Sequence, residues 1–282
     1  MKLAAKEPLA ETLAVALDVA REAGQILVEG WGTRPAVGFK SEDINLVTEY
    51  DKRSEALIVE RLARAFPADR IVAEEGSLVA GSAGDASKRV WYVDPLDGTT
   101  NFAHGLPLFS VSLGLVVEGR AALGVVSAPV LGWTFAGTTG GGPTGGSTFN
   151  GKPIAPSATE QLSRALLVTG FPYARNPIQD NLAEWAAFTG AAQGTRRLGS
   201  AALDLCFVAC GWLDGYWERA LHPWDLVAGA AIVEGAGGRA TDLDGSPFDG
   251  RTGRVLASNG RIHEQMSGVL HEVASRSNTP WP

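Results

Sequence analysis

The stretch Asp94-Pro95-Leu96-Asp97-Gly98-Thr99-Thr100-Asn101-Phe102 decides how the rest of the sequence is interpreted. Its two acidic residues flank a proline that restricts the backbone, so both carboxylates can reach one hard cation. The backbone carbonyl of Leu96 offers a further oxygen. Gly98 and Thr99 follow where a helix is expected to begin, and the free N–H groups at a helix start attract anions. The stretch therefore predicts a metal site beside a phosphate site.

Further acidic residues stand at the ends of predicted elements. Asp51 lies at the start of a helix predicted over 48–65, Glu74 follows a strand predicted over 71–73, and Asp225 begins a helix predicted over 224–236. Carboxylates at strand ends of α/β sheets face the cleft where ligands bind. Taken singly, Asp51 and Asp225 are better explained as helix caps. Only in combination with the central stretch do they indicate a site.

Hydrophobic periodicity predicts an α+β first half and an α/β second half. The expected helices cover residues 8–30, 48–65, 178–193, 199–213, 224–236 and 261–275. The expected strands cover 71–73, 90–93, several segments between 110 and 137, 166–169, 216–218 and 255–257. We expect residues 1–155 and 156–282 to form the two halves of one compact catalytic unit, with most metal ligands in the first half and Asp225 in the second.

Composition narrows the classes of protein. The chain has 282 residues, 45% of them hydrophobic, which is enough for a full core and excludes intrinsic disorder. Its net charge of −7 argues against non-specific attraction to nucleic acid. Cys206 and Cys210 would share one helix face, a poor geometry for a disulfide. With no signal peptide or membrane span expected, the sequence predicts a cytoplasmic protein.

These motifs together resemble the inositol monophosphatase family of magnesium-dependent, lithium-sensitive phosphatases, in particular its bacterial inositol-1-monophosphatase-like members. The resemblance extends from about residue 8 to residue 270. Residues 94–102 resemble one signature of the family and residues 224–238 resemble the other, while 40–51, 72–75 and 169–172 also fit. Asn45 departs from the aspartate usual in the family, at a position that is not an expected ligand.

The resemblance implies a layered αβαβα sandwich of the sugar phosphatase type, holding two or three Mg²⁺ ions per site. The implied metal ligands are Glu74, Asp94, the carbonyl of Leu96, Asp97 and Asp225. The implied catalytic residues are Glu74 and Thr99, which would position the attacking water, and Asp51, which would bond to Thr99. The implied substrate-binding residues are Asp97, Gly98, Thr99, Gly199, Ser200, Ala201, Glu218 and Asp225.

The activity that the resemblance implies is hydrolysis of myo-inositol 1-phosphate by metal-activated water. Two hard divalent ions can polarise a phosphate, generate hydroxide and stabilise the leaving alkoxide, so no covalent nucleophile is needed. Fructose 1,6-bisphosphate, histidinol phosphate and adenosine 3′,5′-bisphosphate stay open as substrates. A regulatory binding protein on the same scaffold and a metal-stabilised structural protein also stay open. A homodimer is expected from the resemblance, and neither nucleic acid nor membrane is an expected partner.

Other short motifs are better explained structurally. Residues 140–145 fit a dinucleotide fingerprint, but no helix start follows them. Residues 146–152 resemble a P-loop, but Pro153 replaces the hydroxyl residue that binds magnesium. Arg196-Arg197 is expected to be solvated or ion-paired, with a basic contact to a ligand as the alternative. His222 is expected to pack or cap beside Trp224.

Overall fold

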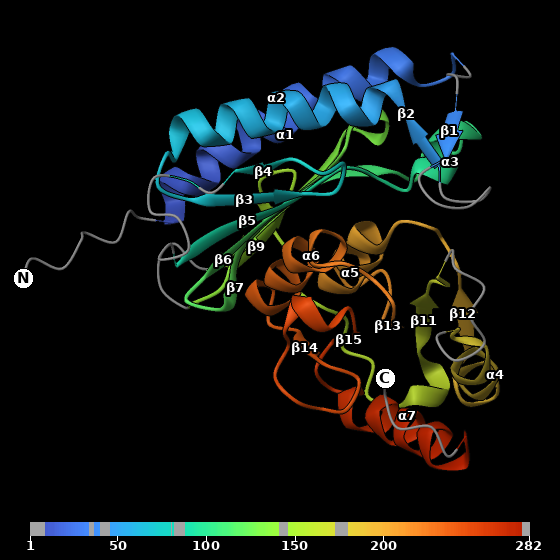
Figure 1. The fold of residues 1–282 in the computed structure, drawn as a ribbon. Coiled ribbons are helices and arrows are strands. Elements are labelled where there is room, and N and C mark those ends of the chain that lie inside the picture. Colours follow the sequence, from blue (N-terminus) through green and yellow to red (C-terminus); the bar gives the residue numbers. More distant parts are fainter. Residues whose placement is uncertain are drawn as a thin grey trace, which may run out of the picture.

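The computed structural model describes residues 9–33, 37–39, 46–79, 81, 88–140, 146–172 and 180–277. These residues form five layers in the order α, β, α, β, α (Figure 1), as the sequence predicted. The helices, from the outer layer through the central layer to the opposite outer layer, are α1 (Leu9–Gly30), α2 (Glu49–Ala65), α5 (Ala201–Ala209), α6 (Pro223–Gly235), α4 (Leu182–Ala191) and α7 (His263–Ser277). The short helix α3 (Thr99–Ala103) lies at one end of the first sheet.

The first sheet has eight strands in the order β10-β9-β8-β7-β6-β5-β3-β4. Its strands are β3 (Arg70–Ala73), β4 (Leu78–Val79), β5 (Arg89–Asp97), β6 (Ser110–Val117), β7 (Arg120–Ala128), β8 (Trp133–Thr138), β9 (Gly146–Phe149) and β10 (Lys152–Pro153). Neighbours run antiparallel except β3 and β5, which are parallel. That parallel pair brings the residues after β3 close to the end of β5, where the acidic residues lie.

The second sheet has five strands in the order β12-β11-β13-β15-β14. Its strands are β11 (Leu166–Thr169), β12 (Gly194–Arg196), β13 (Gly215–Glu218), β14 (Arg239–Thr241) and β15 (Val255–Ser258). Strand β11 runs parallel to β12 and β13, and β15 runs antiparallel to β13 and β14. A separate pair, β1 (Val37–Phe39) and β2 (Leu46–Thr48), lies near α3 at the start of α2. The short 3-10 turns are η2 (Pro129–Leu131), η3 (Leu162–Arg164) and η4 (Gly250–Thr252).

Three hydrophobic cores hold these layers together. The first lies between the α1–α2 layer and the large sheet, and the third lies between the small sheet and the α4–α7 layer. The second core joins Val126 and Phe135 of the large sheet with Tyr216 and Val255 of the small sheet, through the buried faces of α5 and α6. The central helices therefore complete the cores of both sheets.

Helix α6 lies unusually close to the large sheet because the facing sheet positions lack side chains. A Cβ on Gly124 would stand 2.0 Å from the carbonyl oxygen of Ala228, and one on Gly114 would stand 2.7 Å from its nitrogen. No real side chain tolerates such distances, so glycine is required at both positions. This close approach fixes Asp225, in the first turn of α6, against the end of β5.

The central stretch differs from its sequence-based prediction in one respect. We expected a strand ending at Val93 and a turn after it, but β5 continues to Asp97. Asp94 pairs with Ser112 and Asp97 pairs with Ser110, and the register is irregular between them. Proline lacks the N–H that a regular ladder needs, and sheets accommodate it at such irregularities. Asp94 and Asp97 thus project from one bulged strand.

Other element boundaries also differ. The helix predicted over 178–193 is observed as α4 at Leu182–Ala191, where Ala192 is the C-cap residue and the chain turns into β12. Residues 178 and 179 of that prediction lie outside the described residues. Residues 146–153 form the β9–β10 hairpin. The dinucleotide-like match extends into 141–145, which lie outside the described residues. The division of the chain near residue 155 stays a prediction.

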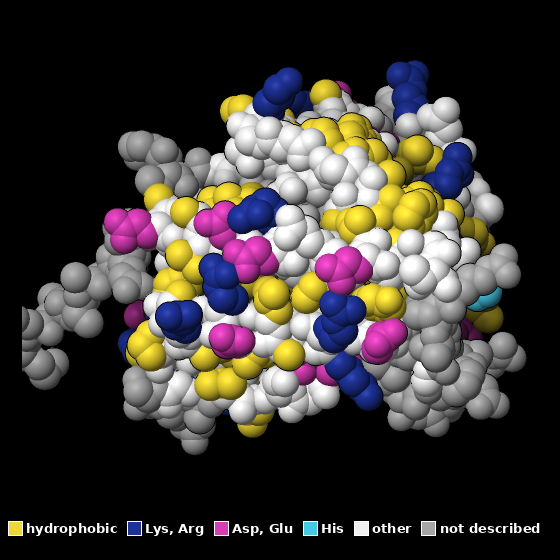
Figure 2. Space-filling view, turned by 90° about the horizontal axis from the view of Figure 1, so that it is seen from above, with side chains coloured by type: hydrophobic (Ala, Val, Ile, Leu, Met, Phe, Trp, Pro, Cys, Tyr) yellow, Lys and Arg dark blue, Asp and Glu magenta, His cyan; other side chains and the backbone are white. Residues whose placement is uncertain are grey.

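The outer face of α1 and α2 mixes charges of both signs, as Figure 2 shows from that side. Arg53 pairs with Glu29 at 2.8 Å, and Arg61 pairs with Glu22. Exposed pairs of this kind add little stability. No helix among the residues listed above reaches the length and apolarity needed to cross a membrane. Cys206 and Cys210 are both free thiols.

Candidate active site

Three carboxylates from two layers converge at the end of β5. Oxygen atoms of Asp94, Asp97 and Asp225 all lie within 4.8 Å of one another. Asp94 and Asp97 are buried, and Asp225 is half-buried in the first turn of α6. Glu74, half-buried in the turn after β3, lies close enough to Asp94 to raise the pKa of Asp94. Four acidic side chains so close together, two of them buried and two half-buried, are stable as anions only beside positive charge, and an all-oxygen donor set suits Mg²⁺.

The electrostatics show the cost of this crowding. Burial raises the pKa of Asp94 well above its ordinary value, and the charges of Glu74, Asp97 and Asp225 raise it further. Burial likewise raises the pKa of Asp225, with Glu74 and Asp97 adding to it. Asp97 rises only to a pKa of about 6, because hydrogen bonds from Ser200 and Ala202 offset part of the burial. Bound divalent cations would remove this penalty.

The start of α2 supports Thr99. The Asp51 carboxylate accepts hydrogen bonds from the Thr48 backbone N–H at 2.8 Å and the Thr48 hydroxyl at 2.5 Å, which completes a capping box. It also lies 3.3 Å from the Thr99 hydroxyl, which in turn is 3.0 Å from the carbonyl oxygen of Leu96. Asp51 therefore combines the cap role with a contact to the site. It is not a member of the three-carboxylate cluster.

Further along the same helix face, two residues hold the segments that carry the acidic cluster. The Ser54 hydroxyl donates to the carbonyl oxygen of Pro95 at 3.0 Å. The Glu55 carboxylate accepts from the backbone N–H groups of Glu75, at 2.7 Å, and Ser77, at 3.1 Å. Because Asp51, Ser54 and Glu55 are spaced three and four residues apart, one helical face supports all these segments.

The N-terminus of α5 holds Asp97 from the other side. The Ser200 hydroxyl donates to its Oδ2, and the backbone N–H groups of Ala202 and Ala201 donate at 3.0 and 3.3 Å. In these contacts, backbone amides and the positive end of the helix dipole stabilise the Asp97 carboxylate. Ser200 is also the N-cap of α5. The predicted residues Ser200 and Ala201 thus contact Asp97 directly.

Gly98 and Gly199 bring the loop before α5 against the start of α3. Gly98 has a left-handed φ of 91°, and a Cβ there would stand 3.2 Å from the carbonyl oxygen of Gly199. The side chain of Asn101 joins the same two segments, since its Nδ2 donates to the carbonyls of Leu108 at 2.7 Å and Leu198 at 2.8 Å. The two predicted glycines therefore meet at one junction.

Glu218 lies at the end of β13, separate from the three clustered carboxylates. We call this side of the site the acidic wall. Its carboxylate is buried and accepts a hydrogen bond from the Tyr216 hydroxyl at 2.6 Å. Burial raises its pKa to about 7, although Tyr216 and the positive charge of Arg197 both oppose the shift. Asp204 is buried nearby, and burial, with a further contribution from the charge of Glu218, raises the pKa of Asp204 well above its ordinary value. This wall is acidic, so it is suited to accept hydrogen bonds from hydroxyl groups.

Two secondary predictions have outcomes at this site. The Arg197 guanidinium lies over Gly199, where a Cβ would stand 2.5 Å from one of its nitrogens, whereas Arg196 donates to the carbonyl of Thr195. His222 stacks on Trp224 with ring centroids 4.6 Å apart and is the N-cap residue of α6. Its predicted role beside Trp224 is confirmed.

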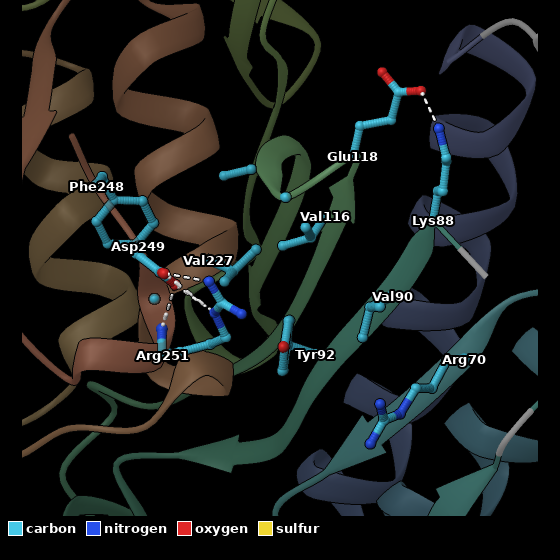
Figure 3. Close-up of a pocket in the computed structure, with 13 residues that line it drawn as sticks. Arg70, Lys88, Val90, Tyr92, Val116, Glu118, Val227, Phe248, Asp249 and Arg251 are labelled. Atoms are coloured by element: carbon cyan, nitrogen blue, oxygen red, sulfur yellow. Dashed lines mark hydrogen bonds and ion pairs between the residues drawn. The ribbon is translucent and has the colours of Figure 1, made fainter. Parts of the chain in front are cut away.

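A hollow of about 380 Å³ lies on the side of β5 that also carries the acidic cluster, but none of the clustered carboxylates lines it (Figure 3). Its apolar lining includes Val227 and Phe248, and Tyr92 lies between its walls. Two of the cations at its rim are paired, Lys88 with Glu118 at 3.2 Å and Arg251 with Asp249 at 2.6 Å. The hollow is therefore distinct from the acidic site.

Comparison with known proteins agrees with this geometry. The model of the inositol monophosphatase family matches residues 8–276, nearly the whole chain. The chain belongs to the inositol monophosphatase family. Members of this family are phosphatases that depend on metal ions, generally Mg²⁺, and act on small phosphorylated substrates. The protein is accordingly a phosphatase, as the sequence predicted.

Individual family members are similar over most of their length. An inositol-1-monophosphatase of Synechocystis is 43% identical over 260 residues, which is 92% of this chain and 88% of the relative. A Nus factor SuhB of Pseudomonas aeruginosa is 38% identical over 252 residues, covering 88% and 91%. The solved inositol monophosphatase of Anabaena superposes with a TM-score of 0.84 at 42% identity, covering 96% of this chain and all of that one.

Sequence reasoning missed several residues of this family member's site. Ser54, Glu55 and Asn101 hold the acidic segments in place, and Asp204 and Tyr216 accompany Glu218. One signal was present in the sequence. Polar residues at positions 54 and 55 share a helix face with Ile58 and Leu62, which pack in the core. A polar side chain on an apolar face needs a buried partner.

Proposed function

We propose that this phosphatase hydrolyses a small polyol phosphate monoester, with myo-inositol 1-phosphate as the leading substrate. The convergence of Asp94, Asp97 and Asp225 within 4.8 Å carries the proposal, together with the acidic wall at Glu218. A negatively charged phosphate needs cations, which the three clustered carboxylates can bind. An uncharged polyol needs hydrogen-bond acceptors, which the acidic wall at Glu218 provides.

The proposed metal ligands are Glu74, Asp94, the carbonyl of Leu96, Asp97 and Asp225, which would hold two or three Mg²⁺ ions. Bound Mg²⁺ would polarise the phosphate, lower the pKa of a water molecule and stabilise the leaving oxygen. Support comes from the donor set, which consists of oxygen atoms alone, and from the raised pKa values of Asp94 and Asp225. Such carboxylates bind a cation in place of a proton.

The remaining residues would orient the reactants. Glu74 and Thr99 would hold the attacking water, and Asp51 would fix the Thr99 hydroxyl, in line with their 3.3 Å contact. The backbone amides of Gly98 and Thr99 would bind the phosphate. The substrate's hydroxyls would contact Asp97, the backbone of 199–201, Glu218 and Asp225. Correct positioning of this kind accounts for much of an enzyme's rate enhancement.

A panel of phosphate esters tests the proposal. Phosphate release would be measured with Mg²⁺ for myo-inositol 1-phosphate, fructose 1,6-bisphosphate, histidinol phosphate and adenosine 3′,5′-bisphosphate, with and without Li⁺. We expect the highest kcat/KM for the inositol ester and no turnover by Asp97→Asn. A matched control is Asp18→Asn, since Asp18 is an exposed residue of α1 paired with Arg21. A higher kcat/KM for another ester would reassign the substrate.

A regulatory role on the same scaffold is a second candidate. It is supported by the 38% identity to a relative named a Nus factor. The presence of all five proposed catalytic and metal-binding carboxylates favours catalysis, so regulation would be additional. Affinity capture with RNA polymerase and its elongation factors tests this role, and failure to capture any of them contradicts it.

The assembly and location stay proposals of the same kind. We propose a homodimer, which light scattering would test directly. A cytoplasmic location is supported by the two free thiols, because a reducing compartment preserves them. Cell fractionation would test the location.

A further inference from the structure

We propose that Gly170 and Tyr216 are positioning residues that hold the Glu218 carboxylate toward the substrate's hydroxyl groups, and thereby set a preference for polyol phosphates over phosphate esters without hydroxyls. This inference rests on the proposed function, in which Glu218 contacts the polyol. Gly170 and Tyr216 themselves have no contact with the phosphate in this proposal.

Gly170 supplies the space that the carboxylate occupies. It directly follows β11, and a Cβ built on it would stand 2.2 Å from each carboxylate oxygen of Glu218. Its φ is not in the left-handed region, so its own backbone would accept other residues. The backbone N–H of Gly170 also favours the ionised form of Glu218, since it lowers the pKa of that carboxyl. The requirement for glycine therefore comes from the carboxylate.

Tyr216 holds the same carboxylate from within the strand that carries Glu218. It stands two residues before Glu218 on β13, so both side chains project from the same face of the sheet. Its hydroxyl donates to Oε2 of Glu218 at 2.6 Å, and its ring is fully buried in the core between the two sheets. A buried ring has few alternative rotamers, so this donor is rigidly placed.

The hydrogen-bonding capacity of the Glu218 carboxylate explains why its placement by Gly170 and Tyr216 matters for the substrate. An ionised carboxylate can accept about four hydrogen bonds. Tyr216 and Gly170 provide two donors, which leaves about two acceptor positions for hydroxyls of a polyol. Asp204 is buried beside the same carboxylate, and burial raises the pKa of Asp204 well above its ordinary value. Without the two donors, Glu218 would be protonated or displaced, and its remaining acceptors would be lost.

Steady-state kinetics on two substrates test the role of Tyr216. Myo-inositol 1-phosphate carries hydroxyls, whereas 4-nitrophenyl phosphate carries none. We expect Tyr216→Phe to raise KM for the inositol ester by about tenfold, the order expected for losing a hydrogen bond to a charged group. Its kinetics with 4-nitrophenyl phosphate should be unchanged. Tyr92→Phe, which removes a hydroxyl from the separate hollow of Figure 3, is the matched control.

A double-mutant cycle tests Gly170. Gly170→Ala should also raise KM for the inositol ester selectively, but should have no further effect in a Glu218→Ala background, where no carboxylate obstructs the new methyl group. Gly190→Ala is the control, since a Cβ at that helix position meets nothing within 4 Å. Melting temperatures would confirm that each variant folds. If Gly170→Ala alone fails to fold, folding of the double variant with Glu218→Ala would likewise show that the Glu218 carboxylate is what requires glycine at this position.

The outcomes separate the two proposals. Equal losses on both substrates, or additive effects in the cycle, would overturn the positioning roles of Gly170 and Tyr216. Absence of phosphate release by the unmodified enzyme from both esters would instead contradict the proposed function itself.

Discussion

The carboxylate of Glu55 accepts a hydrogen bond from the backbone N–H of Glu75 at 2.7 Å. This contact joins the buried face of α2 to the turn that carries Glu74, a proposed metal ligand. The turn contains Gly76 in a left-handed conformation, and the backbone N–H of Glu74 donates to the carbonyl oxygen of Val93 at 3.1 Å, so Glu55 adds a second attachment on the other side of Glu74. The geometry of the acidic cluster therefore depends on a residue outside it.

Replacing Glu55 should weaken metal binding without touching a ligand. Glu55→Ala leaves two backbone N–H groups without their acceptor, which costs on the order of 1–3 kcal/mol in stability and releases the Glu74 turn. We expect a higher Mg²⁺ concentration for half-maximal activity. Glu60→Ala, an exposed position on the same helix, is the control. Identical Mg²⁺ dependence in the two variants would show that the turn does not need Glu55.

Magnesium should stabilise the folded protein. The clustered carboxylates repel one another, and a cation that binds only the folded state adds about 2.7 kcal/mol when its concentration is about 100 times Kd. For a chain of this size the melting temperature should rise by roughly 5 °C or more. Calorimetry of the EDTA-treated protein with added Mg²⁺ measures this. Asp97→Asn should lose the increase and Asp18→Asn should keep it; an equal increase in both would rule out the assigned site.

The metal-free protein should become less stable as the pH rises. Burial raises the pKa of Asp97 to about 6 and that of Glu218 to about 7, against about 4 in an unfolded chain. Between these values the folded state binds more protons at these two groups, so their contribution to the free energy of unfolding is greatest below about pH 4 and is lost as they ionise in the folded protein. Melting temperatures from about pH 5 to about pH 8, with and without Mg²⁺, measure the trend.

Magnesium requires ionised ligands, so its stabilising effect should grow over the same pH range. Glu218→Gln should reduce the decline in the metal-free protein near neutral pH while leaving the part due to Asp97 and the other carboxyl groups whose pKa values burial also raises. A metal-free melting temperature that climbs toward neutral pH would contradict the raised pKa values.

The close packing of α6 on the large sheet should make Gly124 intolerant of substitution. A methyl group there would lie 2.0 Å from the carbonyl oxygen of Ala228, and relieving the clash requires moving α6. We expect Gly124→Ala to cost about 3 kcal/mol or more. Gly268→Ala is the matched control, because a Cβ there meets nothing within 4 Å and the residue lies inside α7. That variant should gain about 0.5–1 kcal/mol. Urea unfolding of both variants provides the comparison.

Much of the fold was predictable because hydrophobic periodicity and motif order are local properties of the chain. Most helices followed from them, as did the recurrence of acidic residues at element ends, whereas the order of the layers was implied by the family resemblance. The bulge in β5 was not predictable in the same way, since the pairing of Asp94 and Asp97 with Ser112 and Ser110 depends on a neighbouring strand. Proline suggested a turn, and the sheet accommodated it instead.

The supporting residues escaped prediction for a related reason. Glu55 resembles an ordinary surface acid of a helix until its partner Glu75, 20 residues away on another segment, is known. Tyr216 resembles an ordinary strand aromatic, and its bond to Glu218, two residues along β13, shows only once both side chains are placed on the same face of the sheet. The 35 glycines of the chain are visible in the sequence, but which of them allow α6 to approach the sheet is visible only in the structure.

The central helix layer has a consequence for how the chain folds during synthesis. The inner face of the eight-stranded sheet is complete once residue 153 has emerged, yet the helix that covers much of it, α6, spans Pro223–Gly235. An apolar sheet face left uncovered for this interval invites aggregation. Asp225 arrives with the same helix, so on the proposed ligand set the nascent chain acquires its complete metal site only as it gains the cover for this face.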